Sequence, residues 1–416
     1  MPPETSTRIL DPIYGGNFSS GSRGALPFVL PDELVETDPL RILEPSPARV
    51  APPCVHFGAC GGCQYQHAAY PAQLAIKSQI LQGILANIET PAIRTHHAAE
   101  WHYRNRIRLR VEPSPNGGSS MGYSRRASND FLPIRMCPIA APLLLRAAEA
   151  LLEFAPKRLL AAISEVELFC TADESRLQMQ LFLREPSADP AAFNALCERL
   201  HAELPELAGA GAELDPELNR RVRRRWAGLA WGAPGLNYQA AGRAYWVSRG
   251  AFFQINRFLI DHLVELVCAG ASGDLAWDLF AGVGLFTRAL AERFNRVVAV
   301  EAGGPAAADL IAASRAGAAF EAVHAATLDF LRARELQRER PQLIVLDPPR
   351  AGLGPEASAV LARIACERVV YVSCDPVTLA RDLAVLTRTY RIDTLDLIDL
   401  FPQTFHMETV VHLKRR

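Results

Sequence analysis

The fold is decided by the stretch LAWDLFAGVGLFTRALAERFNRVVAVE, residues 275–301. A short apolar strand pattern runs into a turn that contains Gly282 and Gly284, and a helical pattern begins near Leu285. A second β-prone run then ends in Glu301. Because short apolar strands alternate with amphipathic helices here and through the rest of the C-terminal third, the sequence predicts a parallel, doubly wound α/β sheet.

The glycine turn and the acidic strand end together indicate a nucleoside cofactor. Glycines at such a turn let the backbone approach a ligand closely, and the N-terminus of the following helix presents free amide groups. Glu301 stands where a carboxylate reaches ribose hydroxyls. The third glycine of the dinucleotide motif is absent, which favours S-adenosylmethionine over a pyrophosphate cofactor. A purely structural turn is the alternative.

Two further strand patterns end in residues that carry chemistry. LIVLDPPRAG, residues 343–352, ends its strand at Asp347, and VVYVSCDPVTLARDL, residues 369–383, places Cys374 directly after a strand. Ligands of open parallel sheets bind outside the carboxyl ends of the strands. A thiol at that edge is therefore a candidate nucleophile, although a buried structural thiol is the ordinary alternative for a single cysteine.

Length and composition set the class of protein. The chain has 416 residues, 49% of them hydrophobic and 21% charged, and a formal net charge of -1, as expected for a soluble protein of two or three domains. No apolar run is long enough to span a membrane, and the polar start MPPETSTRILDP carries no secretory signal. We therefore expect a cytoplasmic protein without membrane contact whose nine cysteines form no disulfide framework.

The pattern of elements changes twice along the chain, which predicts three domains. Residues 1–50 contain short β-prone pieces broken by glycine, serine and proline, and a proline-rich linker follows at 44–53. Residues 51–235 mix helical and strand patterns, as in an α+β domain. Residues 236–416 carry the α/β alternation.

Two arginine clusters interrupt the balanced charge. In WHYRNRIRLRV, residues 101–111, four arginines alternate with amide and apolar residues, so a strand would gather them on one face. They are Arg104, Arg106, Arg108 and Arg110. RRVRRRW at 220–226 forms the second cluster. A solvated charged face is the ordinary explanation, but two arginine-rich clusters favour phosphate binding, because a guanidinium binds phosphate oxygens in pairs.

Several motifs together resemble one enzyme family. DLFAGVGLFT, LDPPRAGL, VSCDPVTLARDL and FPQTFHMETV follow one another in that order, and GAFFQIN precedes them at 250–256. They are similar to the motifs of the RNA 5-methyluridine methyltransferases, bacterial enzymes that methylate carbon 5 of uracil in 23S rRNA or tRNA. The resemblance covers residues 51–416 and is greatest to the iron-sulfur-containing 23S rRNA branch. It implies a class I S-adenosylmethionine-dependent methyltransferase fold, which is Rossmann-like.

The resemblance assigns a role to each motif. Cys374 would add to carbon 6 of uracil, which turns carbon 5 into a nucleophile, and Glu408 would remove the carbon 5 proton. S-adenosylmethionine is the implied cofactor, and its implied contacts are Gln254, Phe280, Glu301 and Asp347. Taken alone, Glu408 is more typical of a surface carboxylate and Phe280 of core packing. Arg350 would either meet substrate phosphate or cap a helix.

Four cysteines have the spacing of a metal site. CVHFGACGGC contains Cys54, Cys60 and Cys63, and Cys137 is followed by proline. Spacing alone leaves zinc and an iron-sulfur cluster open, with His56 and His67 as further possible zinc ligands. The resemblance implies a structural 4Fe-4S cluster held by the four cysteines. The other thiols, which we expect to be buried, are Cys170, Cys197, Cys268 and Cys366.

The N-terminus resembles only part of a family domain. IYGGNFSSGSRGALPFVLPDELVE is similar to the first half of an RNA-binding TRAM β-barrel, which is OB-like, but LVETDPLRILEPSPARV follows almost at once. We therefore expect a truncated module and expect the arginine clusters to carry more of the RNA affinity. Substitution of Arg104, Arg106 and Arg108 by Gln should then weaken RNA binding and flatten its salt dependence.

The hypothesis that follows is an RNA uracil-5-methyltransferase, most consistent with 23S rRNA as substrate and expected to be a monomer. The same reaction on tRNA is the nearest alternative, because both substrates need the same catalytic residues. A non-catalytic RNA-binding or assembly protein of the same fold has no need for Cys374 and Glu408. A redox sensor that depends on the cluster is a third alternative.

Overall fold

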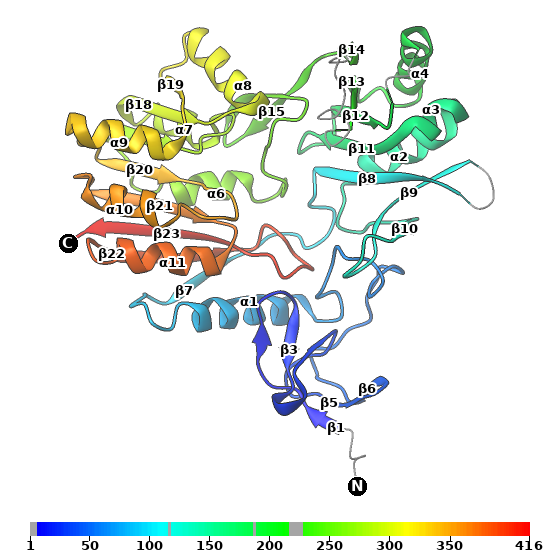
Figure 1. Cartoon of the computed structure of the whole chain (residues 1–416), viewed down its shortest axis with the longest axis horizontal. Helices are drawn as coiled ribbons and strands as arrows, with labels where there is room; N and C mark the ends of the chain where they lie inside the picture. The colour runs from blue at the N-terminus through cyan, green and yellow to red at the C-terminus, as the bar shows by residue number, and fades with distance from the viewer. Residues whose placement is uncertain (1–5, 115–117, 186–188, 216–227) are drawn as a thin grey trace. The chain divides into compact units, whose positions relative to one another are not determined.

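The computed structural model describes the whole chain except residues 1–5, 115–117, 186–188 and 216–227 (Figure 1). The chain forms two compact units, each assembled from segments that are distant in sequence. The first unit contains Met1–Glu100, Asp274–Leu279 and Thr327–Arg416. The second unit contains Trp101–Gly273 and Phe280–Ala326. The three predicted domains along the chain stay a prediction.

Six strands of the first unit lie side by side, and three consecutive ones are parallel, as the sequence predicts. In spatial order they are β17 (Gly273–Leu279), β20 (Leu343–Leu346), β21 (Arg368–Ser373), β23 (Glu408–Arg415), β22 (Tyr390–Ile398) and β7 (Ile93–His96). β17, β20 and β21 run parallel, β23 is antiparallel to both of its neighbours, and β7 is parallel to β22. All four residues of β20 are buried, as in a sheet covered on both faces.

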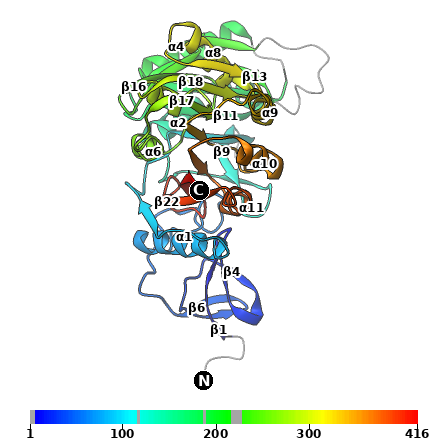
Figure 2. The same cartoon turned by 90° about the vertical axis from the view of Figure 1, so that its left-hand side faces the viewer.

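Four helices belong to the same unit. They are α1 (Tyr70–Ile84), α9 (Thr327–Gln337), α10 (Pro355–Arg363) and α11 (Pro376–Leu386). α1 lies between the N-terminal strands and the β7 edge of the sheet (Figures 1 and 2). Local periodicity did not indicate that α1 and β7 join this sheet, because their partners lie some three hundred residues later in the sequence, as in the pairing of Ile93 with Leu395.

The N-terminal residues form more strands than the sequence analysis expected. One small sheet contains β1 (Ser6–Arg8), β5 (Leu34–Thr37) and β6 (Leu40–Glu44), and the other contains β2 (Pro12–Ile13), β3 (Asn17–Ser19) and β4 (Ala25–Pro27). The segment LVETDPLRILE, interpreted above as following a truncated module, forms the β5–β6 hairpin that pairs with β1. Phe18 and Val35 are fully buried. The similarity to a TRAM domain stays a prediction.

The proline-rich segment 44–53 is not a free linker. Arg49 binds Glu33 through two nitrogens, with Nε–Oε1 and Nη2–Oε2 distances of 2.5 and 2.6 Å, and the Glu33 side chain is fully buried. The backbone of Val50 also donates to the carbonyl of His67 at 2.9 Å. The prolines predicted a linker because composition does not reveal that Arg49 pairs with Glu33 of the preceding module.

The second unit contains a seven-stranded sheet. In spatial order its strands are β10 (Phe131–Pro133), β9 (Ser119–Ser124), β8 (Arg106–Pro113), β11 (Ile163–Cys170), β12 (Leu177–Leu183), β13 (Leu207–Leu214) and β14 (Leu229–Gly232). The helices α2 (Pro142–Phe154), α3 (Lys157–Ala162) and α4 (Pro190–Glu203) pack on it. Ile107, Leu109 and Val111 of β8 are buried in its core, so the predicted alternation along this strand is confirmed.

The remaining elements of the second unit surround the glycine turn. β15 (Gly235–Ala240) and β16 (Arg243–Ser248) form a hairpin, and β18 (Phe294–Glu301) runs parallel to β19 (Glu321–His324). The helices are α6 (Ile260–Val267), α7 (Leu285–Leu290) and α8 (Gly304–Arg315). Within the described ranges, no helix of either unit is both long and apolar enough to cross a membrane.

Candidate active site

Three of the predicted site residues meet at one edge of the first unit's sheet. Asp347 follows β20 and Cys374 follows β21, and these two strands are parallel neighbours. Glu408 begins β23, which pairs with β21 so that Ser373 lies opposite Thr409. The antiparallel register therefore sets Cys374 opposite Glu408, a proximity that no local sequence pattern encodes.

Burial and neighbouring carboxylates raise the pKa of two acidic groups at this edge. Burial, followed by the negative charge of Asp347, raises the pKa of Glu408 well above its usual range. Burial and then Asp278 raise the pKa of Asp347 to about 7. Glu408 is only 3% exposed, and among the described residues its Oε1 has no hydrogen-bond partner. The edge therefore favours bound protons or a cation.

The negative charges of Glu408 and Asp347 also act on Cys374. Burial, then Glu408 and Asp347, raise the pKa of its thiol to about 12, while Arg350 acts in the opposite direction. The thiol is therefore protonated at neutral pH in the absence of ligands. A bound cation at this edge would lower the pKa of Cys374 and of Glu408, because it stabilises both conjugate bases.

The loops that carry these residues are held by local hydrogen bonds. Asp375 caps α11, since its Oδ1 accepts the amides of Val377 and Thr378 at 3.1 and 2.9 Å. The exposed Arg350 places its Nη2 3.3 Å from the ring nitrogens of His406, two residues before Glu408. The arginine of the Asp-Pro-Pro-Arg motif thus approaches the segment that leads to the predicted base.

Three of the predicted cofactor residues belong to the second unit. Glu301 ends β18, and its Oε2 accepts the amide of Gly282 at 2.9 Å, so the carboxylate is attached to the glycine turn itself. Gly282 and Gly284 have φ values of +57° and +90°, which explains why glycine stands at both positions. Phe280 also has a positive φ of +64°, an unusual conformation for a bulky residue that often marks functional sites. Gln254 is buried.

The four predicted metal ligands are not gathered into a metal site. None of the nine cysteines forms a disulfide. Within the part of the chain that the structure describes, no group of three or more Cys, His, Asp or Glu side chains is arranged to hold a metal ion. Cys54, Cys60 and Cys63 lie in one loop of the first unit, where the Cys60 sulfur accepts the amide of Gly62 at 3.4 Å. Cys137 belongs to the second unit.

Four further cysteines and His67 lie in the interior of the protein. Cys170, Cys197, Cys268 and Cys366 are buried, as predicted. His67 is 1% exposed, burial lowers its pKa to about 4, and its Nε2 lies 3.1 Å from the carbonyl oxygen of Val29. One ring nitrogen of His67, which the sequence left as an alternative zinc ligand, therefore already has a hydrogen-bond partner.

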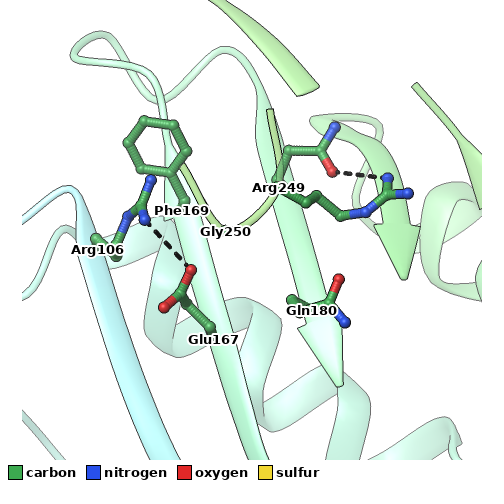
Figure 3. A pocket seen from close by; sticks show the side chains of 7 residues that line it. Arg106, Glu167, Phe169, Gln180, Arg249 and Gly250 are labelled. Atoms are coloured by element: carbon green, nitrogen blue, oxygen red, sulfur yellow. Dashed lines mark hydrogen bonds and ion pairs between the residues drawn. The ribbon is translucent and has the colours of Figure 1, made fainter. Parts of the chain in front are cut away.

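The arginines of β8 share one face, as predicted, but that face supplies its own anions. Arg106 Nη1 lies 3.3 Å from Glu167 Oε1, and Arg108 Nε lies 2.6 Å from Glu165 Oε2. Figure 3 shows Arg106 and Glu167 pointing toward one another beside the Phe169 ring, which lies 4.2 Å from the guanidinium carbon. Phosphate binding by this face stays a prediction, and two of its arginines already pair with glutamates. The second cluster, at 220–226, lies outside the described residues.

The comparisons with known proteins identify the family of this chain. The family model described as tRNA (Uracil-5-)-methyltransferase matches residues 234–416. A 23S rRNA (uracil(1939)-C(5))-methyltransferase RlmD from Chromohalobacter salexigens is 32% identical over 90% of this chain and 78% of that protein. Its counterpart from Enterobacter sp. is 32% identical over 89% of this chain and 84% of that protein. The chain belongs to the RNA uracil-5-methyltransferase family.

A solved structure supports the fold assignment. The Pyrococcus abyssi tRNA (uracil-54, C5)-methyltransferase, determined with S-adenosyl-L-homocysteine, matches with a TM-score of 0.75 and covers 98% of this chain and 100% of its own. Its sequence identity is 22%, so this likeness concerns the fold alone. The predicted class I methyltransferase fold of this RNA uracil-5-methyltransferase is thereby confirmed.

Two residues at the site were not predicted. Asp278 is fully buried at the end of β17 and helps to raise the pKa of Asp347. Its position at a strand end, in the quoted LAWDLF stretch, was a usable signal. Tyr14 lies far away in sequence, yet its hydroxyl donates to Asp375 at 3.0 Å. No sequence pattern indicated that contact.

Proposed function

We propose that this enzyme methylates carbon 5 of a specific uridine in 23S rRNA, with S-adenosylmethionine as methyl donor and a covalent intermediate at Cys374. The observation that carries the proposal is the strand register that sets Cys374 opposite Glu408, beside Asp347. A thiol and a buried carboxyl at one sheet edge suit covalent catalysis followed by proton removal.

The residues present fit a cationic methyl donor. The positive-φ glycines at 282 and 284 leave the backbone open to a ligand, and Glu301 stands at the turn as a ribose acceptor. Carboxyl groups whose pKa values are raised by one another favour a positive charge nearby. When bound, S-adenosylmethionine supplies an electrophilic methyl group on a positively charged sulfur. Gln254 and Phe280 are the further proposed contacts.

The chain's own groups account for the proton and electron movements. Cys374 first releases its thiol proton to solvent. Its sulfur then forms a bond to carbon 6 of the uracil, and the electrons of the carbon 5–carbon 6 double bond move toward the ring carbonyl. Carbon 5 then takes the methyl group, whose bond to the donor sulfur breaks and leaves a neutral thioether. Glu408 removes the remaining proton from carbon 5, the double bond re-forms, and the Cys374 sulfur leaves as a thiolate. General-base assistance of this kind contributes about 10²- to 10⁴-fold in rate.

The target base must leave its stack to reach the sheet edge. Extrusion of a nucleotide costs on the order of a few kcal/mol and least in single-stranded regions. We therefore place the substrate uridine in a loop or other unpaired region of the RNA. The 23S rRNA assignment is supported by the two relatives that are 32% identical. The tRNA alternative is supported by the description of the family model.

The first test uses RNA in which 5-fluorouracil replaces uracil. Fluorine at carbon 5 cannot leave as a proton, so the methylated adduct should persist through denaturation and map to Cys374. Cys374→Ser should form no adduct. Cys366→Ser is the matched control, because this buried thiol of the same unit only donates to the Arg368 carbonyl at 2.9 Å. An adduct with 23S rRNA fragments and not with tRNA supports the proposed substrate, and the reverse result supports the alternative.

Absence of an adduct with both RNAs, from protein that binds RNA and cofactor, would favour the non-catalytic alternative. Glu408→Gln gives an independent check with natural RNA. Loss of the base should let the methylated Cys374 adduct accumulate on unsubstituted RNA. A Glu408→Gln variant that turns over at the wild-type rate would remove Glu408 from the mechanism.

The 4Fe-4S cluster remains part of the proposal on the family resemblance alone. Cys54, Cys60, Cys63 and Cys137 would hold it, but the described residues do not form a metal-binding group, so no catalytic step is assigned to it. Iron and acid-labile sulfide should be measured in anaerobically purified protein. Their loss in Cys60→Ser, with Cys197→Ser as the buried control, would support the cluster, and stoichiometric zinc would support the alternative.

A further inference from the structure

The tip of an N-terminal hairpin reaches the loops that carry both proposed catalytic residues. The turn between β2 and β3 contains Gly15 and Gly16, with φ values of +104° and +85°. A Cβ atom at Gly16 would lie 2.7 Å from Gln64 Cγ, so any side chain larger than hydrogen would be excluded. The tight turn holds Tyr14 against the C-terminal part of the same unit.

The Tyr14 hydroxyl binds the residue next to the nucleophile. It donates to Asp375 Oδ2 at 3.0 Å, while Asp375 Oδ1 accepts the first amides of α11. Both carboxylate oxygens of Asp375 are therefore engaged, one by the helix and one by Tyr14. Ser373 Oγ also donates to the Asp375 carbonyl at 3.0 Å. Cys374 lies between two residues whose conformations are fixed in this way.

The Tyr14 ring contacts the other catalytic loop. Its edge meets the ring of Phe405, with centroids 5.5 Å apart and planes at 81°. The Phe405 amide donates to Gln64 Oε1 at 3.3 Å, and its ring packs against His406 at 4.1 Å. Glu408 follows two residues after His406. One tyrosine therefore touches the loop of Cys374 with its hydroxyl and the loop of Glu408 with its ring.

We propose that Tyr14 is a positioning residue for methyl transfer, which fixes Cys374 through Asp375 and the segment before Glu408 through Phe405. This inference rests on the roles proposed above for Cys374 and Glu408. It gives the N-terminal strands a part in the chemical step in addition to any part in RNA binding. Small displacements of a reacting group cost large factors in rate, so even one such hydrogen bond matters.

The hydroxyl is suited to this task at any pH at which the enzyme works. Burial, and then the negative charge of Asp375, raise the pKa of Tyr14. The phenol therefore keeps its proton and remains a donor to the carboxylate. A hydrogen bond to a charged acceptor is stronger than one between neutral groups, which favours a defined geometry.

The test compares Tyr14→Phe with Tyr65→Phe. Both substitutions remove one hydroxyl from the first unit, but the Tyr65 hydroxyl is buried and has no hydrogen-bond partner among the described residues. With saturating RNA and S-adenosylmethionine, the single-turnover rate of Tyr14→Phe should fall about tenfold, while its KM and Kd for RNA and its melting temperature stay near those of the wild type. Tyr65→Phe should keep the wild-type rate.

A second readout does not depend on methyl transfer. Iodoacetamide alkylates Cys374 at a rate that depends on pH and that peptide mass spectrometry can follow. The pH profile of this rate should shift to higher pH in Tyr14→Phe, because Asp375 loses a donor that offsets its negative charge. Tyr65→Phe should leave that pH profile unchanged.

Three results would overturn the inference. One is an unchanged single-turnover rate together with an unchanged alkylation profile in Tyr14→Phe. Another is a weaker RNA Kd at an unchanged rate, which would make Tyr14 an RNA contact. The third is an equal loss of rate in Tyr65→Phe. If the wild type forms no fluorouracil adduct, the proposed function fails, and the alkylation profile still decides the role of Tyr14 at Cys374.

Discussion

Two buried groups of ionisable side chains in the first unit differ in how their charges are paired: one joins opposite charges, and the other brings like charges together. Lys77 of α1 and Asp399 are both fully buried, and Nζ lies 2.6 Å from Oδ1. Asp399 also accepts the Tyr70 hydroxyl at 3.0 Å, and Lys77 donates to the Phe401 carbonyl at 2.9 Å. A few residues later in the chain, Glu408 is buried where its nearest charged influence is another acid, Asp347.

We interpret the Lys77–Asp399 pair as structural and the Glu408–Asp347 pair as part of the proposed active site. The Lys77–Asp399 pair attaches α1 to the start of the segment that leads to Glu408. Gln73 reinforces that attachment, because its Nε2 donates to Gln403 Oε1 at 2.9 Å and its Oε1 accepts the backbone amide of Gln403 at 3.0 Å. At Glu408 and Asp347 the like charges oppose folding, which is the usual cost of a site prepared for a cation or a proton transfer. Opposite charges are thus directly paired at Lys77 and Asp399, whereas Arg350 only partly offsets the negative charge around Glu408.

Breaking the compensated pair should have the largest effect. Lys77→Met leaves Asp399 buried without its cation, and the free energy of unfolding should fall by about 3–5 kcal/mol. The measurement is equilibrium denaturation in urea at neutral pH. The double variant Lys77→Met/Asp399→Asn is the control and should recover much of the loss, because no buried charge then remains. A single variant as stable as the wild type would mean that the pair is not a structural anchor.

Removing the uncompensated acid should have the opposite sign. The pKa of Glu408 is raised on folding, so the folded chain keeps a proton that the unfolded chain loses above its ordinary pKa. Stability in the absence of ligand therefore falls as pH rises from about 4 toward the raised value. Glu408→Gln has no proton to lose and should be more stable than the wild type at pH 8, while losing turnover.

For Asp347, the expected change in stability falls within a defined pH range. Its pKa is raised to about 7, so the stability of the wild type should decline between roughly pH 4 and pH 7 and then level off at this position. Asp347→Asn should show a shallower decline. Thermal unfolding at pH 4.5 and pH 8, without cofactor, gives both comparisons. If Glu408→Gln and Asp347→Asn are both less stable than the wild type at pH 8, repulsion between the two carboxylates does not destabilise the fold.

The β8 arginines should show the smallest effect, because their charge is compensated on a partly exposed face. Arg108→Gln removes an ion pair with Glu165 whose side chains are 43% and 28% exposed, so stability should change by less than about 1 kcal/mol. If Arg108 also contacts one phosphate, the slope of log K for RNA against log salt should become shallower by about 0.7. An unchanged slope would make this arginine structural.

The sequence predicted the parts of the fold that are local. Strand-turn-helix alternation around Gly282 and the strand ends at Asp347 and Cys374 required only patterns a few residues long, and the structure has them where they were expected. The buried face of β8 followed from a period of two. These features survive because each is determined by residues that are close in sequence.

The missed features all depend on distant partners. The anions that face Arg106 and Arg108 lie on β11, some sixty residues later, and Glu33 neutralises Arg49 from the preceding module. Cys374 and Glu408 were paired by family resemblance, whereas their approach in space follows from the β21–β23 register. Periodicity states which face a side chain occupies and not which residue it will meet there.

The pairing of β7 with β22 also determines when a newly made chain becomes an enzyme. β7 precedes the strand it pairs with, at Leu395–Ile398, by some three hundred residues, so the two strands are synthesised far apart in time. Until the later segment is made, β7 lacks this partner strand and Lys77 of α1 lacks Asp399. A nascent chain that stops before β23 contains Cys374 without Glu408, so the two proposed catalytic residues come together only after β23 has been synthesised.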